Sequence, residues 1–182
     1  MSKLCIFLAE GFEEIEALTV VDLCKRAAID ISMVSITKDL TVTGSHQIPV
    51  TCDCILDEVD FNQADMIILP GGMPGTRNLE ACEKLMAEVD AFHAQKKYLS
   101  AICAAPSIFG HKGILKGQTA CCYPTFESHL EGATVSANPV ETSEHFITSR
   151  GMGTAIEFGL AIIARIKDQA TSDEIAKSII YK

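Results

Sequence analysis

Cys103 is the residue whose surroundings best suit a reactive thiol. It follows the apolar segment 98–102, which is bounded by polar residues and predicts a buried strand. Ala104, Ala105 and Pro106 come directly after it and predict a sharp turn into a helix. Because amides at a helix N-terminus favour an anion, this position predicts an acidic, nucleophilic thiol. A buried cysteine that only fills the core is the alternative.

Glu16 is the second residue suited to chemistry. At helical spacing it shares a stripe with apolar residues of a predicted helix over 13–28, so its carboxyl should begin the buried face. A carboxyl in an apolar setting has a raised pKa, and its protonated form can donate a hydrogen bond to a thiolate. A solvated glutamate at a helix start is the alternative. The helix dipole alone accounts for Glu13 and Glu14.

Backbone amides complete the candidate site. Gly71 and Gly72 follow a predicted strand and let the backbone approach a ligand closely. The amides of Gly72 and Ala104 are candidates for an oxyanion hole beside Cys103. Taken alone, the Pro-Gly-Gly sequence is only a turn.

Neither a local Cys-His dyad nor a metal site is expected. No histidine follows Cys103 directly, and the scattered histidines favour surface or structural roles. The close cysteine pairs lack the Cys-x-x-Cys spacing of metal sites, so we expect no metal and no cofactor. The residues concerned are His46, His93, His111, His129, His145, Cys52, Cys54, Cys121 and Cys122.

Composition narrows the class of protein. The 182 residues carry a formal net charge of -9 without a basic run, which argues against binding to nucleic acid or to an anionic membrane. No apolar stretch approaches the roughly 20 residues that span a bilayer. Eight cysteines without a signal-peptide pattern indicate reduced thiols, so we expect a cytoplasmic protein. The length suits a single domain over residues 1–182.

The order of the predicted elements gives the fold class. Strands are expected over 3–9, 31–37, 65–69, 98–102, 118–123 and 145–149. A hairpin or two short strands are expected over 40–50, and a loop with a short strand or two over 131–144. Helices are expected over 13–28, 83–95, from 106 onward, over 153–167, and near the C-terminus behind a capping box of Thr171 and Glu174. This alternation predicts an α/β fold with a mostly parallel sheet and helices on both faces.

The ends of these strands bring the candidate residues together. In an open α/β sheet a site lies outside the carboxyl ends of the strands. That rule places residues 10–11, residues 71–72, Cys103 and Tyr123 in one neighbourhood, although they lie far apart in the sequence.

Four segments resemble, in order, the motifs of the ThiJ/PfpI superfamily. They are Gly-Phe-Glu-Glu-Ile-Glu at 11–16, Leu-Pro-Gly-Gly at 69–72, Ala-Ile-Cys-Ala-Ala-Pro at 101–106 and Thr-Ser-Arg-Gly-Met-Gly-Thr at 148–154. Together they are most similar to the DJ-one/YajL-like branch and span nearly the whole chain. The resemblance implies a flavodoxin-like, doubly wound fold and usually a homodimer.

The resemblance also implies roles for single residues. Cys103 takes the place of the oxidation-sensitive nucleophile, Glu16 that of the protonated glutamate, and Gly72 with Ala104 that of the oxyanion amides. Arg150 lies in the Ser-Arg-Gly-x-Gly-Thr motif and is expected to be structural rather than catalytic.

Two departures from the superfamily pattern bear on activity. The protease-like branch has a histidine directly after the cysteine, where this chain has Ala104, so peptidase activity is not expected. Where DJ-one-like proteins have a histidine near the site, this chain has Tyr123 before Pro124. Proton transfer would therefore fall to Glu16, Tyr123 or water.

The resemblance implies three functions. The first is a cofactor-free, cysteine-dependent glyoxalase or deglycase that acts on small dicarbonyls or on glycated protein. Cys103 would then attack an aldehyde, and Glu16 would move the proton. The second is an oxidative-stress sensor or redox-regulated chaperone, in which oxidation of Cys103 to sulfinate is the decisive event. A role in a thiamine pathway, suggested only by the superfamily name, is the third.

Overall fold

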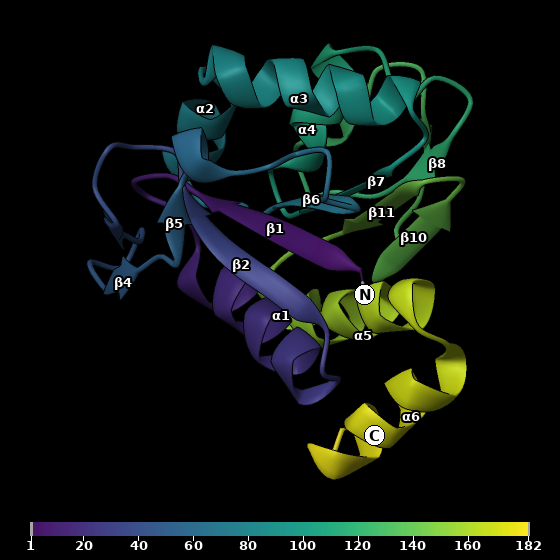
Figure 1. The fold of residues 1–182 in the computed structure, drawn as a ribbon. Coiled ribbons are helices and arrows are strands. Elements are labelled where there is room, and N and C mark those ends of the chain that lie inside the picture. Colours follow the sequence, from purple (N-terminus) through teal and green to yellow (C-terminus); the bar gives the residue numbers. More distant parts are fainter. Residues whose placement is uncertain (1, 182) are drawn as a thin grey trace.

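A seven-stranded sheet forms the centre of the computed structural model, which describes residues 2–181 (Figure 1). Its strands are β1 (Lys3–Leu8), β2 (Asp30–Ser35), β5 (Cys54–Ile55), β6 (Met66–Leu69), β7 (Tyr98–Ile102), β10 (Val140–Ser143) and β11 (Phe146–Ser149). The order is β10-β11-β7-β6-β1-β2-β5, and every neighbouring pair is parallel except β10 with β11. The predicted α/β class with a mostly parallel sheet is confirmed.

Helices cover both faces of this sheet (Figure 1). On one side lie α1 (Glu14–Arg26) and α5 (Ala155–Ile166), with α6 (Gln169–Ser178) packed against α5. On the other side lie α2 (Gly75–Glu80), α3 (Glu83–Ala94) and α4 (Pro106–His111). Short 3-10 turns occur at Leu56–Glu58, Glu127–His129 and Met152–Thr154. None of the helices in residues 2–181 is long and apolar enough to cross a membrane.

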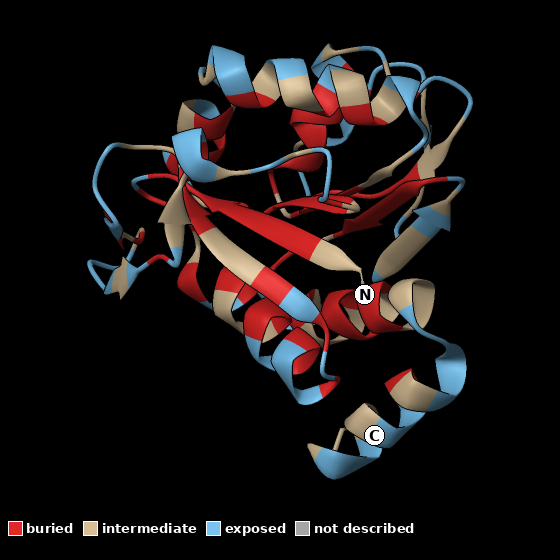
Figure 2. Ribbon diagram, viewed as in Figure 1, coloured by how far each residue is buried: buried red, intermediate tan, exposed pale blue. Residues whose placement is uncertain are grey.

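The core explains why β1 is an uninterrupted apolar segment. Side chains along a strand point alternately to opposite faces, so Leu4 and Ile6 join the cluster under α1 and α5, whereas Cys5 and Phe7 join the one under α3 and α4. A central parallel strand is buried on both faces, and Figure 2 shows β1 buried along most of its length.

One predicted strand differs in the structure, whereas the predicted hairpin is confirmed. The segment 118–123 forms only β8 (Thr119–Ala120), which pairs with β9 (Thr134–Val135) in a separate ribbon rather than in the main sheet. The hairpin predicted over 40–50 is present as β3 (Thr41–Thr43) and β4 (Pro49–Thr51), which pair antiparallel.

The predicted helices also need two corrections. Helix α2 was not expected, because the Pro-Gly-Gly-Met-Pro sequence before it is dominated by turn signals. The capping box at Thr171 and Glu174 is wrong. Asp168 is the N-cap instead, since its carboxylate accepts a hydrogen bond from the Thr171 N–H at 2.7 Å and α6 begins at Gln169.

Candidate active site

Cys103 lies in the turn between β7 and α4, at the carboxyl edge of the sheet. Its φ of +66° falls in the left-handed region, which is uncommon for a residue with a side chain and often marks a functional site. Hydrogen bonds hold this backbone on both sides. The Cys103 N–H donates to the Ser149 carbonyl at 3.0 Å, and its carbonyl accepts from the Tyr123 N–H at 2.8 Å. The side chain is half-buried.

Glu16 reaches the same place from the first turn of α1. Its side chain is buried, as the apolar stripe predicts. The Gly71 N–H donates to Glu16 Oε2 at 2.9 Å, and the Cys103 side chain and the Met152 amide are further hydrogen-bond partners. The carboxyl therefore lies against the thiol.

Glu13 holds this arrangement and was missed as a functional residue. It is the N-cap of α1, and its Oε2 accepts a hydrogen bond from the Glu16 N–H at 2.7 Å. The spacing of two glutamates three residues apart at a helix start is the signal that would have revealed this role.

The environment of the pair disfavours two negative charges. Burial raises the pKa of the Glu16 carboxyl to about 7. Burial also raises the pKa of the Cys103 thiol to about 12, and the charge of Glu16 contributes, whereas the amides of Ala104 and Gly72 act in the opposite direction. The sequence predicts a lowered pKa for the Cys103 thiol, whereas beside an ionised Glu16 the pKa of this thiol is raised. Protonation of Glu16 removes the repulsion and supplies a hydrogen-bond donor.

Gly71 and Gly72 allow the backbone after β6 to approach the side chains of Cys103 and Glu16 closely. The amides of Gly72 and Ala104 both hydrogen-bond to the Cys103 sulfur. A Cβ on Gly71 would lie 2.6 Å from both the Cys103 Cβ and Glu16 Oε2, so no side chain fits there. Gly72 has a φ of +92°, and a Cβ there would lie 2.6 Å from the Gly11 carbonyl oxygen.

We expect Gly71→Ala to lower the free energy of unfolding by about 1–3 kcal/mol, because the added methyl overlaps two side chains of the site. Gly153→Ala is the matched control, since a Cβ there meets nothing within 4 Å. The control should leave stability unchanged or raise it slightly. Urea unfolding at neutral pH measures both, and equal losses would contradict the steric argument.

Tyr123 borders the site as predicted, but a hydrogen bond to Cys103 holds it there rather than the end of a strand in the main sheet. It follows a loop rather than a strand of the main sheet, and its N–H is bonded to the Cys103 carbonyl. A Cβ on Gly151 would lie 3.3 Å from the Tyr123 ring and 4.0 Å from Glu16 Oε1. The half-exposed ring therefore lies on the same side of the site as Glu16.

The histidines of residues 2–181 bond to groups other than Cys103. The pairs are His93 with His145 at 3.0 Å, His111 with His129 at 2.9 Å, and His46 with Glu14 at 2.8 Å. Arg150 Nη1 donates to the Ala137 carbonyl at 3.3 Å, which agrees with a structural role.

The raised pKa of Glu16 predicts a pH dependence of stability. The folded protein keeps this proton up to about pH 7, whereas an unfolded chain releases it near the ordinary glutamate value. The stability that the Glu16 proton contributes is thus fully present below the ordinary glutamate pKa, and it is lost as the pH rises towards 7. Unfolding free energies of wild type and Glu16→Gln, measured between pH 5 and 8, should diverge by about 2–3 kcal/mol in favour of the variant. Wild type and variant whose unfolding free energies change with pH in parallel would contradict the raised pKa of Glu16.

Comparison with known proteins gives a consistent result. The chain matches the DJ-1/PfpI family over residues 2–165. It is 31% identical to Protein DJ-1 homolog B of Arabidopsis thaliana over 99% of this chain, but spans only 42% of that relative's length. It is 30% identical to the Glutathione-independent glyoxalase DJ-1 of Schizosaccharomyces pombe, with 98% of each chain covered.

A solved structure agrees over the whole chain. Oxidized DJ-1 of Toxoplasma gondii superposes with a TM-score of 0.95 at 30% identity, covering 100% of this chain and 99% of that one. The match in sequence and the match in fold thus point the same way, and the chain belongs to the DJ-1/PfpI family.

Proposed function

We propose that this protein is a cofactor-free thiol enzyme that converts reactive dicarbonyls, or their early adducts on protein, into 2-hydroxy acids. The observation that carries the proposal is the arrangement around the Cys103 sulfur. The buried Glu16 carboxyl hydrogen-bonds to it, and the amides of Gly72 and Ala104 do so as well. The name of the Schizosaccharomyces pombe relative, a glutathione-independent glyoxalase, supports the same reaction class.

In the first step the Cys103 thiol passes its proton to ionised Glu16, and the resulting thiolate attacks the aldehyde carbon of the dicarbonyl. A carbon–sulfur bond forms and the aldehyde oxygen becomes an oxyanion, which the amides of Gly72 and Ala104 are placed to stabilise. Protonated Glu16 then donates its proton to this oxygen, which gives a hemithioacetal and leaves Glu16 ionised.

In the second step ionised Glu16 removes the proton from the carbon attached to sulfur, which gives an enediolate, and returns it to the neighbouring carbonyl carbon. The hydroxyl proton of the hemithioacetal passes to the oxygen of that neighbouring carbon. The carbon bound to sulfur is thereby oxidised to a thioester, while the adjacent ketone is reduced to an alcohol. Water hydrolyses the thioester, releases the 2-hydroxy acid and restores the thiol. The reaction is an internal redox exchange plus water, so it needs no external oxidant or reductant.

Methylglyoxal in heavy water tests this proposal. The expected product is lactate with deuterium at the carbon that bears the hydroxyl, because Glu16 exchanges its proton with solvent before returning it. Proton NMR of the product measures both formation and labelling. Absence of lactate would overturn the enzymatic function, and unlabelled lactate would overturn the step assigned to Glu16.

The same geometry supports peroxide sensing as a second candidate function. Oxidation of Cys103 to a sulfinate adds two oxygens, which the amides of Gly72 and Ala104 and a protonated Glu16 are placed to bind.

Mild peroxide should therefore add two oxygens at Cys103 before it modifies Cys54 or Cys82, which are equally half-buried but lack these donors. Peptide mass spectrometry after timed exposure measures the order. A disulfide as the first product, or faster oxidation of Cys54, would contradict the sensor. Rapid sulfinate formation in a protein without dicarbonyl turnover would favour sensing over catalysis.

A further inference from the structure

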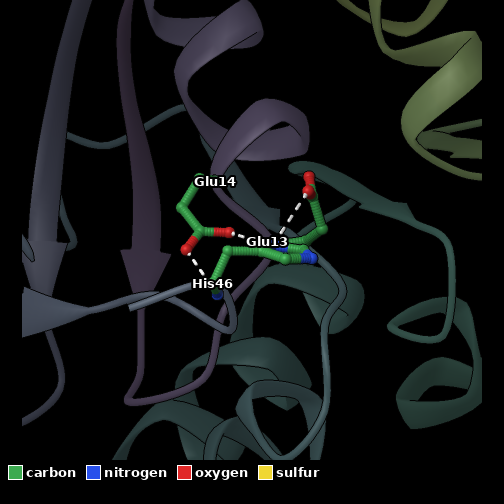
Figure 3. A group of neighbouring side chains, drawn as sticks. All are labelled: Glu13, Glu14 and His46. Carbon is green, nitrogen blue, oxygen red and sulfur yellow. Dashed lines mark hydrogen bonds and ion pairs between the residues drawn. The ribbon is translucent and has the colours of Figure 1, made fainter. Parts of the chain in front are cut away.

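A second group of ionisable side chains lies at the start of α1, and of its members only Glu13 has a role described above, as the N-cap that accepts from the Glu16 N–H. It comprises Glu13, Glu14 and His46, which we call the Glu-Glu-His cluster (Figure 3). The glutamates come from the helix start, and His46 comes from the turn between β3 and β4. One carboxylate oxygen of each glutamate and one imidazole nitrogen all lie within 4.8 Å of one another.

The backbone around this cluster is fixed rather than loosely placed. The β3–β4 hairpin is attached to the loop after β1, because the Gly11 N–H donates to the Thr43 carbonyl and the Ser45 N–H to the Phe12 carbonyl, both at 2.8 Å. The His46 N–H itself donates to Glu14 Oε1 at 2.7 Å. The imidazole is thus held against the helix start before any ligand arrives.

The cluster contains more negative charge than its partners balance. Within residues 2–181, the ion pairs of both glutamates lead to His46, whose Nδ1 lies 2.8 Å from Glu14 Oε2 and 3.9 Å from Glu13 Oε1. His46 carries at most one positive charge against two carboxylates, and the N-terminus of α1 offsets only part of the remainder. The glutamate side chains are only 12% and 5% exposed, so water screens the remaining charge poorly.

The separations suit a metal ion. Zinc binds imidazole nitrogen and carboxylate oxygen at about 2.0–2.2 Å, so its neighbouring ligands lie roughly 3–4 Å apart. A single imidazole with two carboxylates is a donor set for a borderline divalent ion, whereas Mg²⁺ and Ca²⁺ favour oxygen ligands alone. The His46 side chain is 68% exposed, which leaves a path from solvent and room for water ligands.

We propose that Glu13, Glu14 and His46 form a binding site for one divalent transition-metal ion of the zinc type. The ion binds His46 Nδ1, Glu14 Oε2 and Glu13 Oε1, and it displaces the Nδ1 proton to solvent. Glu13 Oε2 keeps its hydrogen bond with the Glu16 N–H. The bound ion joins the β3–β4 hairpin to α1, and it is separate from the Cys103 thiol.

Cobalt titration tests this site, because absorption spectra distinguish nitrogen and oxygen ligands from thiolates. The titration uses the Cys103→Ser variant of the whole chain, so that the half-buried thiol of the candidate active site does not compete. We expect one equivalent of Co²⁺ to bind without a thiolate charge-transfer band, and Zn²⁺ to displace it. His46→Gln and Glu13→Gln should each weaken binding at least about tenfold.

His111→Gln is the matched control, because His111 also hydrogen-bonds to a carboxylate, Glu80 at 2.6 Å, but lies outside the cluster. It should bind Co²⁺ as wild type does. Circular dichroism confirms that each variant is folded. The proposal is overturned by unchanged affinity in His46→Gln, by an equal loss in His111→Gln, by a thiolate band, or by no binding at millimolar Co²⁺. None of these outcomes depends on dicarbonyl turnover.

Discussion

Cys103→Ala should lower kcat/KM for methylglyoxal by about 10⁴-fold or more, because the variant has no nucleophile to form the hemithioacetal. The remaining groups, the Glu16 carboxyl and the amides of Gly72 and Ala104, bind and polarise a dicarbonyl but form no covalent bond with it. Steady-state lactate release measures the loss.

Cys54→Ala is the control for that variant. Cys54 is half-buried like Cys103, but it lies on the edge strand β5, whereas Cys103 follows the interior strand β7. Its removal should leave kcat/KM within about twofold of wild type, since it contacts no group of the proposed mechanism. Turnover that survives in Cys103→Ala would show that the thiol is not the nucleophile.

Glu16→Gln should lower dicarbonyl turnover by about 10²–10⁴-fold, the usual contribution of a general acid-base group. Glutamine keeps a hydrogen-bond donor of similar shape next to the thiol but exchanges no proton. The pKa of the Cys103 thiol should fall in this variant, since the charge of Glu16 contributes to raising it. The variant should therefore alkylate faster at neutral pH while it turns over more slowly.

Two measurements on one preparation separate these effects, namely lactate release and the pH dependence of iodoacetamide labelling at Cys103. Glu83→Gln is the control, because Glu83 also lies in the first turn of a helix but is exposed. Unchanged turnover in Glu16→Gln would exclude Glu16 as the acid-base group. A thiol that becomes less reactive would show that hydrogen bonding, rather than charge, sets its pKa.

Sequence patterns sufficed for the parts of the site that strand ends and helix faces determine. Glu16 lies on a regular apolar stripe, and Cys103 and Gly72 follow adjacent parallel strands, so elementary geometry brings them together. The contact of His46 with Glu14 could not be predicted in the same way. The two residues are 32 positions apart, and their contact depends on how a short hairpin docks on the loop after β1.

The pKa of the Cys103 thiol also could not be predicted from the sequence, because it depends on the assembled site. A helix start predicts a lower pKa for Cys103, and the hydrogen bonds from Ala104 and Gly72 do act in that direction. Burial and the charge of Glu16 outweigh them. Both are properties of the assembled site, because they depend on how far water is excluded and on which group holds the proton.

The two backbone hydrogen bonds of Cys103 have a consequence for how often the backbone around the thiol opens. They join the reactive residue to Ser149 at the end of β11 and to the loop at Tyr123, so its peptide group cannot open without parting the interior strands. Segments of that kind exchange their amide hydrogens only through large openings and resist proteolysis. The Cys103 peptide group is therefore expected to exchange its amide hydrogen slowly, so the sulfur can react repeatedly while the backbone that carries it stays closed.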